Sequence, residues 1–119
     1  MTELLIELLE TFGYHVRLQG SIRIDEQYPD SFFTFWNTDS YDNNHYDNDA
    51  ASYTWDFEVN FYSTDPDLVD QKVKAARSLL KANGFVISGK GHDVGSDETT
   101  HTGRGFRALI MEREVNNNV

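Results

Sequence analysis

The sequence of 119 residues has no cysteine, only two prolines and no apolar run long enough to span a membrane. The absence of cysteine excludes disulfide bonds and thiolate ligands for metals. The first ten residues, MTELLIELLE, place glutamates among leucines and contain no basic residue, so we expect neither a signal peptide nor a membrane span there. These features place the chain in a cytosol.

Basic residues are missing from a long central stretch of the chain. None lies between Arg23 and Lys72, where twelve acidic residues occur, and the net charge is −10. An acidic surface repels phosphate, so we expect no tight binding of nucleic acid. The acids favour solubility, and the alternatives are an acidic face for a basic partner or a surface that mimics nucleic acid.

What is present is a regular alternation of helix and strand patterns. Residues 2–12 place leucines at helical spacing after Thr2, which is a predicted N-cap. A second helix is predicted to begin at Pro66, with Asp65 as its N-cap, and to end at Gly84. Both helices carry one apolar stripe, so each is expected to pack against a sheet.

Five strands are predicted, at residues 14–24, 31–37, 51–63, 85–88 and 106–115. The third has the clearest alternation, which predicts one buried face and one solvent-exposed face. The predicted buried face consists of Tyr53, Trp55, Phe57, Val59 and Phe61, and the predicted exposed face of Ser52, Thr54, Asp56, Glu58 and Asn60.

The order α-β-β-β-α-β-β predicts a single two-layer α+β domain over residues 1–119. We expect a mixed or mostly antiparallel sheet of about five strands, with both helices on the face that carries Trp55 and Phe57. Residues 37–51 and 89–105 are predicted to be long flexible loops, and residues 116–119 a frayed tail.

The first predicted loop contains the acidic stretch NTDSYDNNHYDNDA, residues 37–50. No register supplies the glycine and glutamate of an EF-hand, and a looser calcium or magnesium site of several aspartates remains the alternative. Tyrosines in a polar loop are suited to protein contacts. The candidate interface residues of this loop are Tyr41, Asp42, His45, Tyr46 and Asp47, and the aspartates that would bind a cation are Asp42, Asp47 and Asp49.

The second predicted loop supplies a second candidate interface, formed by Lys90, His92, Asp93, His101 and Arg104. A metal shared by His92 and His101 with Asp93 or Asp97 is the alternative here. The glycines flanking Lys90 and Arg104 match no phosphate-binding motif, and no helix is predicted to follow them. No nucleophile elbow or metalloprotease motif occurs, so we expect a protein that is not an enzyme and needs no cofactor.

One block of the chain, SYTWDFEVNFYSTDPDLVDQKVKAARSLLKANGF, resembles the tail terminator, or tail completion, proteins of long-tailed bacteriophages. It combines an alternating strand, an Asp-Pro-Asp turn that begins a helix, and a glycine that ends it. The resemblance extends by layout to the leading helix, to a strand pair with a long connecting loop, and to the two final strands. The second predicted loop is longer than in that family.

The resemblance implies a ring, typically a hexamer, that caps the tail tube and joins it to the head. The partners it implies are further copies of the chain, the tail tube protein and a head–tail connector protein. The protein would act in the host cytoplasm during assembly and at the head-proximal end of the virion tail. The alternatives are a head–tail connector or other minor virion protein, and an acidic DNA mimic that inhibits a host protein.

Overall fold

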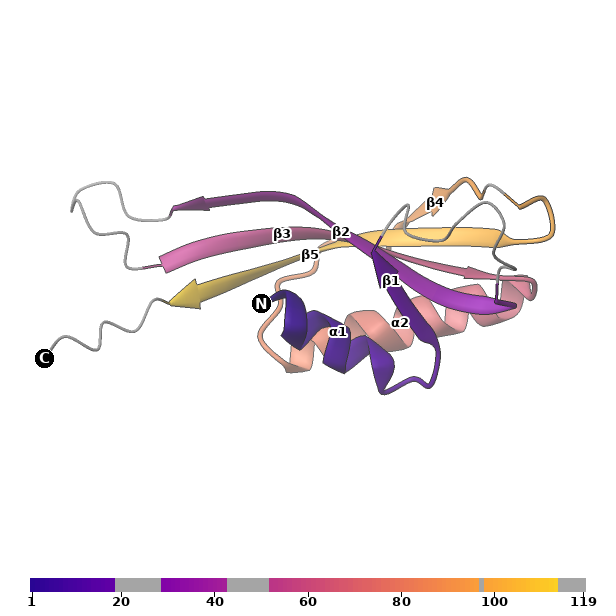
Figure 1. Ribbon diagram of the computed structural model, residues 1–119, viewed down its shortest axis with the longest axis horizontal. Coiled ribbons are helices and arrows are strands. Elements are labelled where there is room, and N and C mark those ends of the chain that lie inside the picture. Colours follow the sequence, from indigo (N-terminus) through magenta and orange to yellow (C-terminus); the bar gives the residue numbers. More distant parts are fainter. Residues whose placement is uncertain (19–28, 43–51, 97, 114–119) are drawn as a thin grey trace, which may run out of the picture.

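The computed structural model describes residues 1–18, 29–42, 52–96 and 98–113 (Figure 1). It confirms the predicted α+β class and the predicted order of elements. In chain order these are α1 (Thr2–Glu10), β1 (His15–Leu18), β2 (Ser31–Asp42), β3 (Ser52–Ser63), α2 (Pro66–Ala82), β4 (His92–Val94) and β5 (Thr102–Arg113).

The strands form one mixed sheet in the order β1-β2-β3-β5-β4. β1 runs parallel to β2, and the three other pairings are antiparallel. A bulge between Asn37 and Asp39 shifts the register of β2 against β3. Three long strands, β2, β3 and β5, therefore form the centre of the sheet, and the short strands β1 and β4 cover parts of its two edges.

Both helices pack on one face of the sheet, as predicted (Figure 1). Leu5 and Leu9 of α1 and the apolar stripe of α2 meet Phe57, with Trp55 packed at the margin of this core. The fully buried side chains include several aromatic rings, and such rings bury much apolar area for few rotatable bonds.

The ends of α2 follow the sequence prediction, but the start of α1 does not. The side chain of Asp65 accepts a hydrogen bond from the Asp67 N–H over 3.0 Å, and Gly84 has a φ of 95°, which favours glycine. Thr2 was predicted to cap α1, but it is the first helical residue. Met1 occupies the N-cap position without a side-chain hydrogen bond. α1 ends at Glu10, two residues earlier than predicted.

The predicted strand at residues 85–88 is wrong. Only Val86 forms a bridge there, opposite Leu109, and Phe85 and Ile87 on either side of it are buried in the core. The chain instead reaches the sheet edge at β4, inside the stretch that was predicted to be a loop over residues 89–105. Gly89 and Gly91 have positive φ angles and redirect the chain toward that edge.

The second strand is also longer than predicted, since β2 continues to Asp42 and the connector before β3 begins only at residue 43. The described part of the predicted strand at 14–24 is β1, and its remainder lies outside the described residues. So do residues 43–51 of the first predicted loop and the predicted tail.

The lengths of the elements explain the shape of the molecule. A strand of 12 residues spans about 40 Å at about 3.3 Å per residue. Helix α2, with 17 residues, spans only about 26 Å. The three long strands therefore extend past the helical layer at one end (Figure 1). We call the outermost part of these strands, residues 40–42, 52–54 and 111–113, the extended ribbon.

The prediction of a solvent-exposed face on β3 is wrong at three positions. Asp56, Glu58 and Asn60 retain only 4%, 6% and 1% of their accessible surface. These three polar side chains of the face opposite the helices are therefore shielded from water and need partners.

Candidate functional site

The first predicted interface begins in the extended ribbon. Tyr41 and Asp42 belong to strand β2, opposite Thr54 and Tyr53 of β3. The other candidates, His45, Tyr46 and Asp47, lie outside the described residues, as does Asp49. A cation site formed by Asp42, Asp47 and Asp49 would include two of these undescribed residues, so it stays a prediction.

Three residues of the second predicted interface do meet one another. Arg104 donates to the Asp93 carboxylate over 3.0 Å and to the backbone carbonyl of Lys90 over 2.9 Å. One arginine therefore joins the turn before β4, β4 itself and the start of β5. The side chain of Asp93 is 94% exposed, so this ion pair contributes little to stability.

The two histidines of this region contact different groups. His92 Nε2 lies 2.8 Å from Glu58 Oε2. His101 Nε2 lies 2.8 Å from the carbonyl oxygen of Pro29, and its ring meets Phe32 edge-on. Within the residues that the structure describes, no three histidine, aspartate or glutamate side chains are arranged to hold a metal ion. Asp97 lies outside those residues.

The sheet face opposite the helices carries a cluster of charged and polar side chains, Asp56, Glu58 and Asn60 of β3 with His92 and Arg107. We call it the outer-face cluster. Arg107 donates from Nε and from its terminal nitrogen to the two carboxylate oxygens of Asp56, so the pair is bidentate. The Asn60 amide, oriented with its nitrogen toward acceptors, donates to Glu58 Oε2 over 2.8 Å.

Burial raises the pKa of the Glu58 carboxyl above its ordinary value, because the low-dielectric surroundings disfavour the charged form. His92 and Arg107 oppose this shift, since their positive charges favour the carboxylate, whereas Asp56 adds to it. Desolvation is the largest of these effects. Glu58 is therefore a carboxyl that lies deep in the sheet face and depends on its neighbours to be ionised.

One glycine of β5, Gly105, makes room for the outer-face cluster, and a second, Gly103, makes room for the Tyr62 ring. A Cβ at Gly105 would lie 2.6 Å from the Glu58 carboxylate and closer still to the Asn60 amide, and one at Gly103 would meet the Tyr62 ring at 2.6 Å. Gly105 pairs with Asn60 on one side and with His92 on the other. Because Gly105 has no side chain, His92 of β4 can reach across β5 to Glu58 of β3. The cluster thereby ties three strands together.

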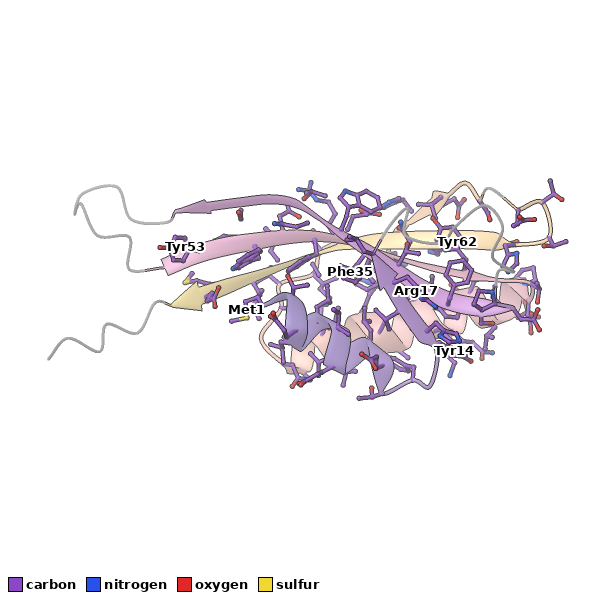
Figure 2. The ribbon with its side chains drawn as sticks, in the orientation of Figure 1. Met1, Tyr14, Arg17, Phe35, Tyr53 and Tyr62 are labelled. Carbon is purple, nitrogen blue, oxygen red and sulfur yellow. The ribbon has the colours of Figure 1, made fainter. Side chains whose placement is uncertain are left out.

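The extended ribbon has a different chemistry. Trp55 stacks on Phe57 and donates from Nε1 to the Glu112 carboxylate over 2.8 Å, which joins β3 to β5 near the root of the ribbon. Tyr53 lies farther out, beyond Met1 and the start of α1 (Figure 2). On the opposite side of β5, Met111 is 60% exposed.

The edges of the extended ribbon differ from those of the rest of the sheet. β1 covers β2 only from Phe32 to Phe35. β4 covers β5 only from Gly103 to Gly105, and Val86 adds a single bridge at Leu109. Beyond these positions, no strand in the described part of the chain pairs with the outside of β2 or β5. Exposed strand edges are a common route to pairing between chains.

The chain matches no protein-family model, and it matches none of the curated proteins. No helix among the described residues is long and apolar enough to cross a membrane.

Sequence reasoning missed the outer-face cluster. The alternation of β3 places Asp56, Glu58 and Asn60 on one face, but the pattern does not reveal that these side chains are buried. A signal was available in Gly103 and Gly105, because glycines inside a strand often mark the close approach of other groups. Sequence analysis assigned these two glycines to a loop instead.

Proposed function

We propose that this chain is a non-enzymatic assembly protein of a long-tailed bacteriophage, a tail terminator that forms a ring, a hexamer, on the end of the tail tube. The observation that carries the proposal is the extended ribbon, in which three strands leave the helical layer with two strand edges that no described strand covers. A ring subunit needs a rigid frame and a surface that meets identical neighbours. In this proposal the sheet with its helices is the rigid frame, and the extended ribbon is the surface that meets the neighbours.

The fold is compatible with the layout expected of that family, with a leading helix, a β2–β3 pair with a long connector, α2 and two final strands. In this proposal the protein assembles in the host cytoplasm and remains at the head-proximal end of the virion tail. Its partners are copies of itself, the tail tube protein and a head–tail connector protein. The net charge of −10 suits a ring through which DNA must pass without binding.

A head–tail connector would use a similar ring but would bind the portal instead of the tube. The acidic mimic is less well supported, because not all of the described acids of the basic-free stretch are exposed. Asp56 and Glu58 are buried against Arg107 and His92, and Asp70 pairs with Lys74 on α2. A duplex mimic would need its carboxylates exposed at regular spacing.

The test is to mix the purified chain with its tail tube protein and to image the tubes by negative-stain electron microscopy. We expect rings at one end of the tubes and an end to further tube growth. Native mass spectrometry of the same mixture should give the subunit number of the ring. A chain that binds the portal and ignores the tubes would be a connector. A chain that forms rings on neither would contradict the proposal.

A further inference from the structure

Strand β4 is held at the edge of the sheet by few contacts (Figure 1). It has three residues, none of which is buried, and it pairs only with residues 103–105 of β5. A short, exposed segment with few apolar contacts opens more readily than the core does. The side chains that attach β4 to the rest of the sheet therefore decide how firmly it stays in place.

One of these attachments joins two titratable groups. His92 of β4 reaches across β5 to Glu58 of β3, with 2.8 Å between Nε2 and Oε2. We propose that this contact is a proton-sensitive latch, which holds β4 on the sheet while His92 is protonated and loosens it when the imidazole loses its proton. The inference does not depend on the proposed function.

Two glycines let the latch close. Gly105 lies between His92 and Asn60 in the register, and a Cβ there would lie 2.6 Å from Glu58 Oε2. Gly91, directly before β4, comes so close to β5 that its Cβ would lie 2.7 Å from the Gly105 carbonyl oxygen. The backbone of β4 therefore lies near enough to β5 for an imidazole to span it.

The two partners differ in their access to water. The side chain of Glu58 is 8% exposed, whereas that of His92 is 51% exposed. The imidazole can therefore exchange its proton with solvent, but water cannot easily replace it as a partner of the carboxyl group. A buried carboxylate that loses a charged partner is left with its cost of desolvation.

Other charged groups around Glu58 compensate only in part. Among the described residues, those that act on it are His92 from β4, Arg107 from β5 and Asp56 from its own strand. Arg107 is bonded to both carboxylate oxygens of Asp56, so its charge serves two acids. Asn60 adds a neutral donor at 2.8 Å. His92 is thus the cation bonded directly to Glu58.

The direction of the pH effect follows from these charges. Histidine ordinarily titrates between about pH 5 and 8. At the acidic end of this range the imidazolium donates a charge-assisted hydrogen bond to Glu58, and this charge is lost as the pH rises. The other attachment of β4 runs from Arg104 to Asp93 and to the Lys90 carbonyl, and arginine keeps its charge throughout. We therefore expect β4 to loosen, without leaving the fold, as the pH rises.

The test is amide hydrogen exchange, read by mass spectrometry on peptides that cover residues 92–94 and 103–105. Protection factors are compared between about pH 5 and 8, after correction for the intrinsic pH dependence of exchange. We expect protection of these peptides in the wild type to fall roughly threefold to tenfold as the pH rises, the loss of one partly exposed charge-assisted contact. Peptides of β3 and α2 should keep their protection.

His92→Gln keeps a hydrogen-bond donor at the same position but cannot be protonated in this range. We expect its β4 peptides to exchange at the fast, high-pH rate of the wild type at every pH. His15→Gln is the matched control, since His15 is an exposed histidine of β1, and it should behave as the wild type does. Circular dichroism and urea unfolding check that both variants remain folded.

Three results would overturn the latch. Protection of β4 in the wild type could be independent of pH, or its pH dependence could persist in His92→Gln. The dependence could also disappear in His101→Gln instead, which would assign it to the contact between His101 and the Pro29 carbonyl. None of these results bears on whether the chain caps tubes.

Discussion

On the helix-facing side of β3, Phe57, Val59 and Phe61 are removed from water by apolar packing, whereas on the opposite side Asp56 and Glu58 are almost as well buried but rely on ion pairs and hydrogen bonds. The two faces belong to the same strand and alternate residue by residue. The two faces are therefore equally buried but are stabilised in different ways, one by apolar packing and the other by polar pairing.

The apolar face depends on volume, and the polar face depends on pairing. Removing atoms from an apolar core leaves a cavity, which lowers the free energy of unfolding in proportion to its size. Removing one partner from a buried polar pair leaves the other desolvated and unsatisfied. Substitutions on the two faces separate these mechanisms in a single strand.

The largest effect is expected from Phe61→Ala on the apolar face. Phe61 is fully buried, with its ring centroid 4.6 Å from that of Phe33 and 5.3 Å from that of Tyr14. We expect the free energy of unfolding to fall by about 3–5 kcal/mol, measured by urea denaturation. Leu18→Ala is the exposed control and should change it by less than about 0.5 kcal/mol. Similar losses in the two variants would contradict the structure.

On the polar face, Arg107→Ala should destabilise the protein by about 1–3 kcal/mol, because it leaves the Asp56 carboxylate buried without its bidentate partner. The effect is smaller than for Phe61 because the Arg107 side chain is itself 60% exposed and water can replace part of the interaction. Denaturant unfolding measures it. Adding Asp56→Asn to the same chain should restore part of the loss, and an additive loss would show that the two side chains are not coupled.

Gly105→Ala tests the space beneath the outer-face cluster. Its new methyl group would force Glu58 and Asn60 to move, and we expect a loss of about 1–3 kcal/mol in unfolding free energy, at or below the effect of Arg107→Ala. Gly95→Ala is a matched control, since nothing lies within 4 Å of its Cβ position and its φ is not positive. Equal stability of the two variants in thermal and denaturant unfolding would show that β5 carries no such constraint.

The sequence predicted those parts of the fold that depend on local patterns, such as the apolar alternation of β3. Alternation and helix-capping signals were sufficient for β3, α2 and the order of elements, because both are local properties of the chain. Of the predicted apolar face of β3, Phe57, Val59 and Phe61 are buried as predicted, whereas Tyr53 and Trp55 are only partly buried. The strand predicted at residues 85–88 was wrong because the alternation of buried Phe85 and Ile87 with exposed Val86 cannot show that only Val86 pairs with β5.

The outer-face cluster was not predictable from local pattern. Glu58 and His92 are 34 residues apart, and Asp56 and Arg107 are 51 apart, so their pairing depends on the order of strands in the sheet. The same holds for the edges of the extended ribbon, since the described pairing of β1 and β4 ends before it. Of the first predicted interface, Tyr41 and Asp42 lie in β2, and the other residues lie outside the described part of the chain.

The smallest predicted effect concerns pH and again separates the two faces. Burial raises the pKa of Glu58 in the folded state, so the folded protein binds a proton more tightly than the unfolded chain does. The contribution of Glu58 to stability is then greatest at low pH and is lost as the pH rises from the ordinary glutamate pKa through the raised value. His92, Arg107 and Asp56 face this carboxyl and set how far the shift extends.

Glu58→Gln removes this titration while it retains a polar side chain at the same position. We measure the free energy of unfolding of both proteins by denaturant at a series of pH values. As the pH rises from the ordinary glutamate pKa through the raised value, we expect the wild type to lose stability relative to Glu58→Gln. Phe57→Leu, on the apolar face, should lower stability by a constant amount at every pH, because it changes packing and no titrating group. A wild type that instead gains stability relative to Glu58→Gln on raising the pH would mean that His92 and Arg107 outweigh desolvation, and that the outer face is held by its ion pairs alone.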